Sequence, residues 1–169
     1  MNSNLDVSYS VNENLGNDLL NQILELNQNN LPALGGIIDL DALSLLYQQS
    51  KFCIYKIWEG QLVAFALIMD QSSKYQSPNY LYFKNKYKGF LYIDRIAVSA
   101  TFQRMGIGHS IYQELFSKTS KLSIPLCCEV NTFPVNQPSL DFHKKNLFQT
   151  IEEISFGKKK VAMLVKPSR

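Results

Sequence analysis

Long apolar runs and paired cysteines are both missing from this chain. No run approaches the ~20 consecutive apolar residues that a membrane-spanning helix needs. Three cysteines, Cys53, Cys127 and Cys128, are an odd number without the spacing of a disulfide framework. The first residues also lack the pattern of a secretory signal peptide. We therefore expect a soluble cytoplasmic protein that meets no membrane, in which Cys127 and Cys128 are buried packing groups.

Histidine and dense basic clusters are scarce too. The chain has two histidines and no Cys/His spacing of a zinc site, so we expect no metal. The formal net charge is +3, and the basic residues are spread out apart from Lys158, Lys159 and Lys160. This triplet lies between two strand-like runs, which favours a solvated hairpin turn. The charge pattern therefore predicts no nucleic-acid partner.

The composition is that of an ordinary globular protein. The chain has 169 residues, of which 46% are apolar and 18% charged, and we expect one domain over residues 1–169. Apolar periodicity predicts strands at 7–11, 52–58, 62–69, 90–98, 124–131, 149–156 and 161–165, and helices at 15–26, 40–49, 108–120 and 139–146. Asp39 is the expected N-cap of the second helix. Residues 71–89 are polar and tyrosine-rich and are interpreted as a long functional loop. This order predicts a mixed sheet with helices packed on it.

A glycine-bearing turn between a strand and a helix is the most informative segment. It reads Gln103-Arg104-Met105-Gly106-Ile107-Gly108. Glycine tolerates a positive φ and lets the backbone approach a ligand closely. The first amides of the following helix are unpaired and favour an anion. The turn therefore predicts a site for a phosphorylated cofactor. It lacks Gly-Lys-Ser/Thr and the full Gly-x-Gly-x-x-Gly, which disfavours a nucleotide-binding protein.

The element order and this turn together resemble the GNAT superfamily of acyl-CoA-dependent N-acetyltransferases. The family signature is Arg/Gln-x-x-Gly-x-Gly/Ala, and residues 103–108 satisfy it. Further family positions are matched by Asn136, Ser139, Phe142 with His143, and Phe148. The resemblance covers about residues 50–169. Leu147 stands where the family usually has glycine, and His143 stands where it often has a general-acid tyrosine.

The resemblance implies an α/β (α+β) fold and a ligand. The expected fold is a GNAT-like, mixed, strongly twisted sheet of about six to seven strands with about four helices, whose central strands splay apart to admit acyl-CoA. The implied cofactor is acetyl-CoA, with its pyrophosphate on the amides of the turn and its pantetheine arm beside the edge of the strand that ends at Val98. The implied cofactor-binding residues are Ile96, Ala97, Val98, Gln103, Arg104, Met105, Gly106, Ile107, Gly108, Asn131, Asn136, Ser139 and Phe142. The N–H of Val98 or a neighbour could polarise the thioester carbonyl, an effect worth about 3 kcal/mol.

The resemblance also implies a reaction. An acetyl group would pass from acetyl-CoA to a primary amine by direct attack in a ternary complex. The candidate bases that take the amine proton are Asp94 and Glu129, on strands that we expect to be neighbours. Asp94 could equally form a salt bridge with Arg95, and for Glu129 a structural or substrate-orienting role is slightly favoured. His143 is the candidate proton donor to the leaving thiolate, and its alternative is a surface histidine.

The acceptor cannot be read from the sequence beyond a small-molecule or peptide amine. The expected substrate-binding residues are Tyr75, Asn79, Tyr80 and Tyr92, since a tyrosine-rich lid offers apolar walls with polar tips. The same tyrosines could instead pack on the sheet. An exposed edge strand in the C-terminal hairpin could pair two subunits into a homodimer. The alternative function is a non-catalytic acyl-CoA-binding regulatory module on the same fold.

Overall fold

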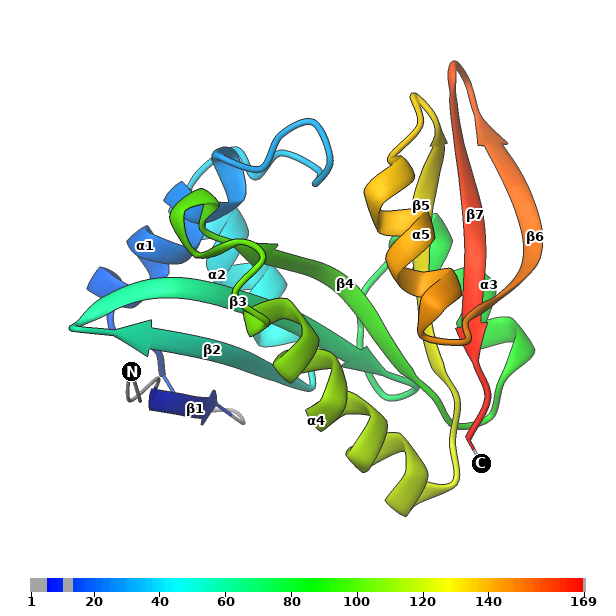
Figure 1. The fold of residues 1–169 in the computed structure, drawn as a ribbon, viewed down its shortest axis with the longest axis horizontal. Coiled ribbons are helices and arrows are strands. Elements are labelled where there is room, and N and C mark those ends of the chain that lie inside the picture. The colour runs from blue at the N-terminus through cyan, green and yellow to red at the C-terminus, as the bar shows by residue number, and fades with distance from the viewer. Residues whose placement is uncertain (1–5, 11–13, 169) are drawn as a thin grey trace.

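One twisted sheet of seven strands lies at the centre of the described structure (Figure 1). The computed structural model describes residues 6–10 and 14–168. The strands are β1 (Asp6–Ser10), β2 (Phe52–Trp58), β3 (Gln61–Asp70), β4 (Leu91–Val98), β5 (Leu126–Phe133), β6 (Gln149–Phe156) and β7 (Lys159–Lys166). The helices are α1 (Asn17–Gln28), α2 (Leu40–Gln49), α3 (Pro78–Lys86), α4 (Ile107–Leu122) and α5 (Gln137–Lys145), with a short 3₁₀ helix η1 (Ala100–Phe102). The strand order is β1-β2-β3-β4-β5-β7-β6, and the expected fold class is confirmed.

The sheet opens between β4 and β5. These two strands run parallel and pair only at Leu91 with Leu126 and at Tyr92 with Cys127, within the described chain. The other neighbours form antiparallel ladders of five or more residue pairs. Figure 1 shows β5, β6 and β7 turning away from β2, β3 and β4. The C-terminal halves of β4 and β5 therefore diverge.

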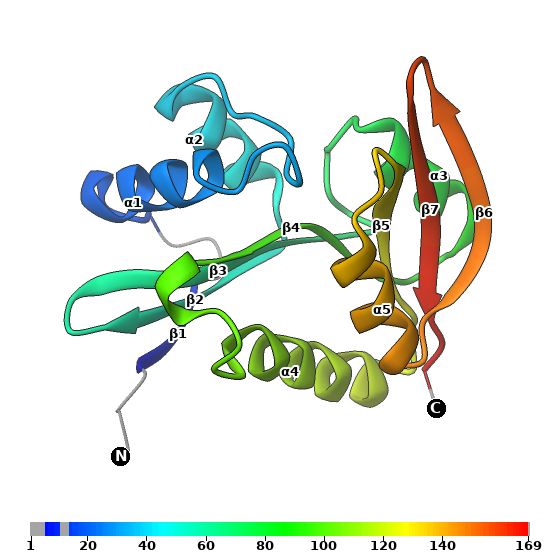
Figure 2. The same cartoon turned by 45° about the horizontal axis from the view of Figure 1, so that its top comes forward.

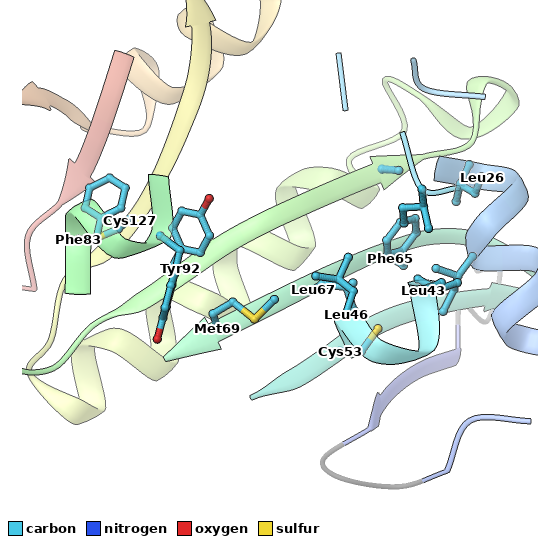
Figure 3. Packing of buried hydrophobic residues seen from close by; sticks show 14 of the residues in the cluster. Leu26, Leu43, Leu46, Cys53, Phe65, Leu67, Met69, Phe83, Tyr92 and Cys127 are labelled. Carbon is cyan, nitrogen blue, oxygen red and sulfur yellow. The ribbon is translucent and has the colours of Figure 1, made fainter. Parts of the chain in front are cut away.

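Helices cover both faces of the sheet (Figure 2). On one face, α1 and α2 pack on β2 to β4, where Leu43 and Leu46 meet the buried side chains of Phe65 and Leu67 (Figure 3). On the other face, α4 buries Ile111 and Leu115 against the sheet and α5 lies beside β5. Alternate residues of β2 to β5 and β7 thus pack into two separate apolar clusters, one on each face of the sheet.

Several local signals fold as expected. Asp39 is extended and its side chain accepts a 2.8 Å hydrogen bond from the N–H of Ala42, which caps α2. Glu59 and Gly60 both have positive φ, at 49° and 80°, and make the tight β2–β3 hairpin. Within the part of the chain that the structure describes, no helix has the length and apolar character needed to cross a bilayer.

Three expectations are corrected or limited. The long loop expected at 71–89 contains the helix α3, which packs on β4 and brings the number of α-helices to five. Lys159 and Lys160 are not in a turn but begin β7, and the hairpin turns at Gly157 and Lys158. Val11, the expected end of the first strand, lies outside the described residues.

Candidate active site

The signature turn leads β4 into α4. Arg104 and Gly106 both adopt the left-handed conformation, with φ of 63° and 81°, and Gly106 is the N-cap of α4. The backbone ladder of the helix begins with a 2.9 Å bond from the N–H of Ser110 to the carbonyl of Gly106. The amides of Ile107 and Gly108 therefore precede the ladder and point out of the helix N-terminus. This arrangement favours an anion, because the helix dipole adds to the exposed donors.

The space around the turn fits a ligand that lies against the backbone. A Cβ built at Gly106 meets no atom within 4 Å, and one built at Gly108 lies 3.6 Å from Cγ2 of Val98, an ordinary contact. The backbone at Gly106 therefore borders open space. Gln103 braces the turn through a 3.4 Å contact from its side-chain amide to the carbonyl of Val98. The side chain of Ile107 is buried in the core, so this residue offers only its main chain outward.

The gap between β4 and β5 leaves backbone groups of β4 available. Ala64 lies opposite Val98, and the N–H of Ser99 donates to the carbonyl of Val63 at 2.8 Å. In an antiparallel ladder this register directs the N–H of Val98 away from β3 and toward the gap. A cavity of about 270 Å³ occupies the gap. Its lining comes from the α1–α2 loop, β4, α4, β5, α5 and the start of β7.

Glu129 is the acidic centre of this cavity. It lies partly buried on β5, and the hydroxyl of the fully buried Tyr92 donates a 2.8 Å hydrogen bond to its carboxylate. The pKa of Glu129 is raised to about 7, first by burial and then by the nearby charge of Asp94, against hydrogen bonds from Tyr92 and Asn79 that lower it. A carboxyl group with this pKa changes protonation state near neutral pH.

Asp94 is held in an ion pair. The β3–β4 register shifts between Leu67 and Ile68, and Asp94 is the extra residue on β4 at this bulge. Its carboxylate lies 2.7 Å from Nε of Arg95, and the two side chains are only 4% and 10% exposed. The salt bridge weighed from the sequence is therefore present. Asp94 also lines the same cavity as Glu129, as expected for acids on neighbouring strands.

Arg95 links this bulge to the wall of the cavity. Its Nη1 donates to the side-chain oxygen of Asn27 at 2.9 Å and to the carbonyl of Gly35 at 3.2 Å. Asn27 is fully buried at the end of α1, and Gly35 lines the cavity. The Arg95 guanidinium therefore fixes the α1–α2 loop relative to Asp94 and Glu129.

His143 is buried rather than on the surface. Its Nε2 lies 2.7 Å from the hydroxyl of Tyr112, and its Nδ1 lies 2.7 Å from the carbonyl of Ser139. A carbonyl can only accept, so Nδ1 carries the proton and Nε2 accepts from Tyr112 when the ring is neutral. Burial lowers the pKa of His143, which keeps the ring neutral. Both side chains line the cavity, so the ring and the phenol form a connected pair at its edge.

The expected substrate-binding residues divide into two groups. Tyr92 and Asn79 both interact with Glu129, and burial together with Asp94 raises the pKa of Tyr75. Tyr80 is different, and its assignment is corrected. It is fully buried, its hydroxyl donates to the carbonyls of Asp70 and Ser73, and its ring packs 5.7 Å from that of Tyr92.

The expected cofactor residues also fall into two groups. Four of them line the cavity: Ile96, Asn131, Asn136 and Ser139. The side chain of Ala97 instead packs in the core, and that of Phe142 packs on Tyr112 with ring centroids 4.8 Å apart. Met105 is exposed at the signature turn. Asn136 also caps α5, where its side chain accepts from the N–H of Ser139.

Three residues of the site were missed from the sequence as site residues: Tyr112, Arg95 as a loop anchor, and Lys159. Tyr112 follows Ile111 on α4 and has the spacing of an ordinary core position, so only its hydroxyl hints at a second role. Lys159 lines the cavity, and its positive charge acts to lower the pKa of Glu129. No local pattern distinguishes it from its neighbours in the lysine triplet.

Comparison with known families identifies the class of protein to which this fold belongs. The chain matches the family model described as "Acetyltransferase (GNAT) family" over residues 20–147. The chain therefore belongs to the GNAT acetyltransferase family. A search of curated protein sequences gave no significant match.

Solved structures share the fold at low sequence identity. The ribosomal-protein-S18-alanine N-acetyltransferase of Escherichia coli is 14% identical, with a TM-score of 0.68 over 97% of this chain and 96% of its own. An N-acetyltransferase from Staphylococcus aureus Mu50 is 17% identical, with a TM-score of 0.68 over 96% and 98%. Arabidopsis thaliana NAA60, solved in complex with acetyl-CoA, is 12% identical, with a TM-score of 0.68 over 96% and 99%. These likenesses establish the fold.

Proposed function

We propose that this protein is an acetyl-CoA-dependent N-acetyltransferase that acetylates a primary amine by direct attack in a ternary complex. The proposal rests on one observation: the signature turn and an acidic cavity adjoin each other in the fold. The signature turn at the start of α4 leads into the β4–β5 gap, and that gap contains a carboxyl group with a pKa of about 7. The first feature suits a phosphate-bearing thioester, and the second suits removal of a proton from an amine.

The residues present fit acetyl-CoA. The amides of residues 104–108 would hold the pyrophosphate, because the turn exposes donors and a Cβ at Gly106 would protrude into otherwise open space. The edge of β4 from Ile96 to Val98 would pair with the pantetheine arm in the manner of an added strand. When bound there, acetyl-CoA supplies an acetyl group activated as a thioester. The N–H of Val98 would donate to the carbonyl oxygen as charge develops on it.

Glu129 is the proposed general base. Its carboxylate accepts from Tyr92, which orients it, and burial keeps its pKa high enough to hold a proton taken from an ammonium group. Asp94 is assigned a supporting role, since its carboxylate is ion-paired with Arg95 and its negative charge helps to raise the pKa of Glu129. This choice departs from the slight preference for a structural role that the sequence alone suggested for Glu129.

Tyr112 and His143 form the proposed proton-donating pair. The phenol donates to Nε2 of His143, so the ring fixes the hydroxyl at the edge of the cavity. To protonate a leaving thiolate, the Tyr112 hydroxyl would turn from Nε2 of His143 toward the sulfur and give up its proton, and the phenolate would then regain a proton from water. Burial raises the pKa of Tyr112, so the phenol keeps its proton until a thiolate is formed beside it. Because burial lowers the pKa of His143, the ring serves as a neutral acceptor rather than as a standing cation.

The direct test is a thiol-release assay with acetyl-CoA and a library of primary amines. Wild-type protein should release CoA only when an amine is present, and mass spectrometry should find the acetylated amine. Glu129→Gln should reduce turnover while leaving calorimetric CoA affinity unchanged, because Glu129 is not among the groups proposed to hold CoA. CoA binding without transfer to any amine would instead identify the non-catalytic acyl-CoA-binding module, and absence of CoA binding would remove both functions.

A further inference from the structure

A larger groove adjoins the active-site cavity. It has a volume of about 750 Å³ and lies between the α1–α2 loop, the β5–α5 loop and the tip of the β6–β7 hairpin. Three large apolar side chains in its walls remain open to solvent: Phe133 is 58% exposed, Val135 59% and Phe156 38%. Exposed apolar side chains gathered around one hollow are typical of a ligand groove.

The groove shares part of its wall with the reaction site. Ala33, Asn131, Asn136 and Lys159 line both the groove and the cavity that contains Glu129. The groove takes no lining from β4, from the signature turn or from α4, among the described residues. The proposed route of CoA runs along those three elements. The groove is therefore left for the second reactant, the acceptor amine.

The charged side chains in the described lining of the groove are all basic. Its described lining includes two lysines, Lys158 and Lys159, and no carboxylate. Lys159 is at the inner end, because it also lines the Glu129 cavity, whereas Lys158 lines only the groove. An occupant that covered the apolar walls and brought an anion to Lys158 would match both the shape and the charge.

We propose that the acceptor is a primary amine whose apolar body carries a carboxylate. This inference rests on the proposed function for the position of the amine beside Glu129. The apolar body lies along Phe133, Val135 and Phe156, and the carboxylate meets Lys158. The amine nitrogen attacks the acetyl carbon, the bond from that carbon to sulfur breaks so that CoA leaves as its thiolate, and Glu129 receives the proton that the nitrogen loses.

Three matched amines test the idea on the full-length protein. The probe 8-aminooctanoate has all three features, octylamine lacks the carboxylate, and 4-aminobutyrate has a shorter apolar body. Calorimetry with and without CoA measures binding, and thiol release measures transfer. We expect 8-aminooctanoate to bind up to about 200-fold more tightly than 4-aminobutyrate, the limit set by full burial of the four methylene groups that it adds. We expect it to bind about fivefold more tightly than octylamine, from its pairing with an exposed lysine.

Charge reversal at the hairpin provides the matched control. Lys158→Glu should abolish the preference for 8-aminooctanoate over octylamine. Lys160→Glu makes the same charge change two residues away, outside the lining of the groove, and should leave the preference intact. Phe133→Ser, at an exposed position, should weaken both eight-carbon amines, with thermal unfolding as the check on folding.

The outcomes separate the two proposals. Equal binding of octylamine and 8-aminooctanoate, or equal effects of Lys158→Glu and Lys160→Glu, would overturn the inference even if other amines are acetylated. Binding of 8-aminooctanoate that depends on Lys158 but leads to no transfer would support the groove and contradict the proposed function. Transfer to 8-aminooctanoate with the expected variant pattern would support both.

Discussion

Replacing Glu129 by glutamine is expected to slow the reaction and to stabilise the fold at neutral pH. Loss of a positioned general base costs about a hundredfold or more in rate. In the wild type, kcat/KM should rise as the pH passes about 7 and then level off, because the base must be deprotonated in the free enzyme. The variant should lack this rise.

The stability effect has the opposite sign, and its size follows from the pKa. Folding moves the pKa of Glu129 from 4.5 to about 7, so the folded state binds a proton that the unfolded state has already lost between these values. The ionised carboxylate therefore destabilises the fold above about pH 7, by about 3 kcal/mol. Below pH 4.5 both states are protonated and the penalty disappears. Glutamine cannot ionise, so Glu129→Gln removes the penalty.

Urea unfolding at pH 4 and pH 8 measures this effect. The free energy of unfolding of Glu129→Gln should match that of the wild type at pH 4 and exceed it by about 3 kcal/mol at pH 8. Glu153→Gln, on the exposed strand β6, is the matched control and should change little at either pH. A Glu129→Gln variant that is less stable than the wild type at pH 8 would refute the burial argument. Full activity in that variant would refute the role as base.

Three further predictions concern the turn, the proton-donating pair and the fold. Gly106→Val should weaken CoA binding about tenfold or more in calorimetry, whereas Gly60→Val imposes a similar backbone strain at φ of 80° on a distant hairpin and should not. Tyr112→Phe should lower kcat with little change in KM. An unchanged kcat would contradict the role of Tyr112 and His143 as a proton-donating pair. Asp39→Ala should lower the stability of the fold by about 1 kcal/mol in urea unfolding, without an effect on CoA affinity, and no loss would mean that the cap is dispensable.

The strands and hairpins were predictable where the local signal was strong. β2 and β6 have the predicted bounds, because β2 is rich in β-branched and aromatic residues and each strand ends at a glycine-bearing turn. The helix α3 was missed because its apolar and aromatic residues form one short run, Tyr80–Phe83, and do not recur at helical spacing. Its stability comes from ring packing against Phe90 and Tyr92 across the fold, which no local pattern reveals. Pro78 after Ser77 was the available start signal.

The site was predictable in its parts and not in its connections. The signature turn and the meeting of Asp94 with Glu129 follow from strand order and glycine chemistry. The pairing of Tyr112 with His143 depends on how α4 and α5 pack, and the sequence separates these residues by 31 positions. The pKa of Glu129 likewise depends on burial by segments far apart in the chain. Tertiary packing therefore decides which of the candidate side chains carry the chemistry.

A crystal structure of the protein with CoA bound would test the central claim most directly. We predict the diphosphate against the main-chain amides of residues 104–108, and the pantetheine arm in the β4–β5 gap beside Ile96 to Val98, with its sulfur near the cavity of Glu129. A structure in which CoA lies outside this gap and leaves the turn at Met105 without a ligand contact would contradict the account.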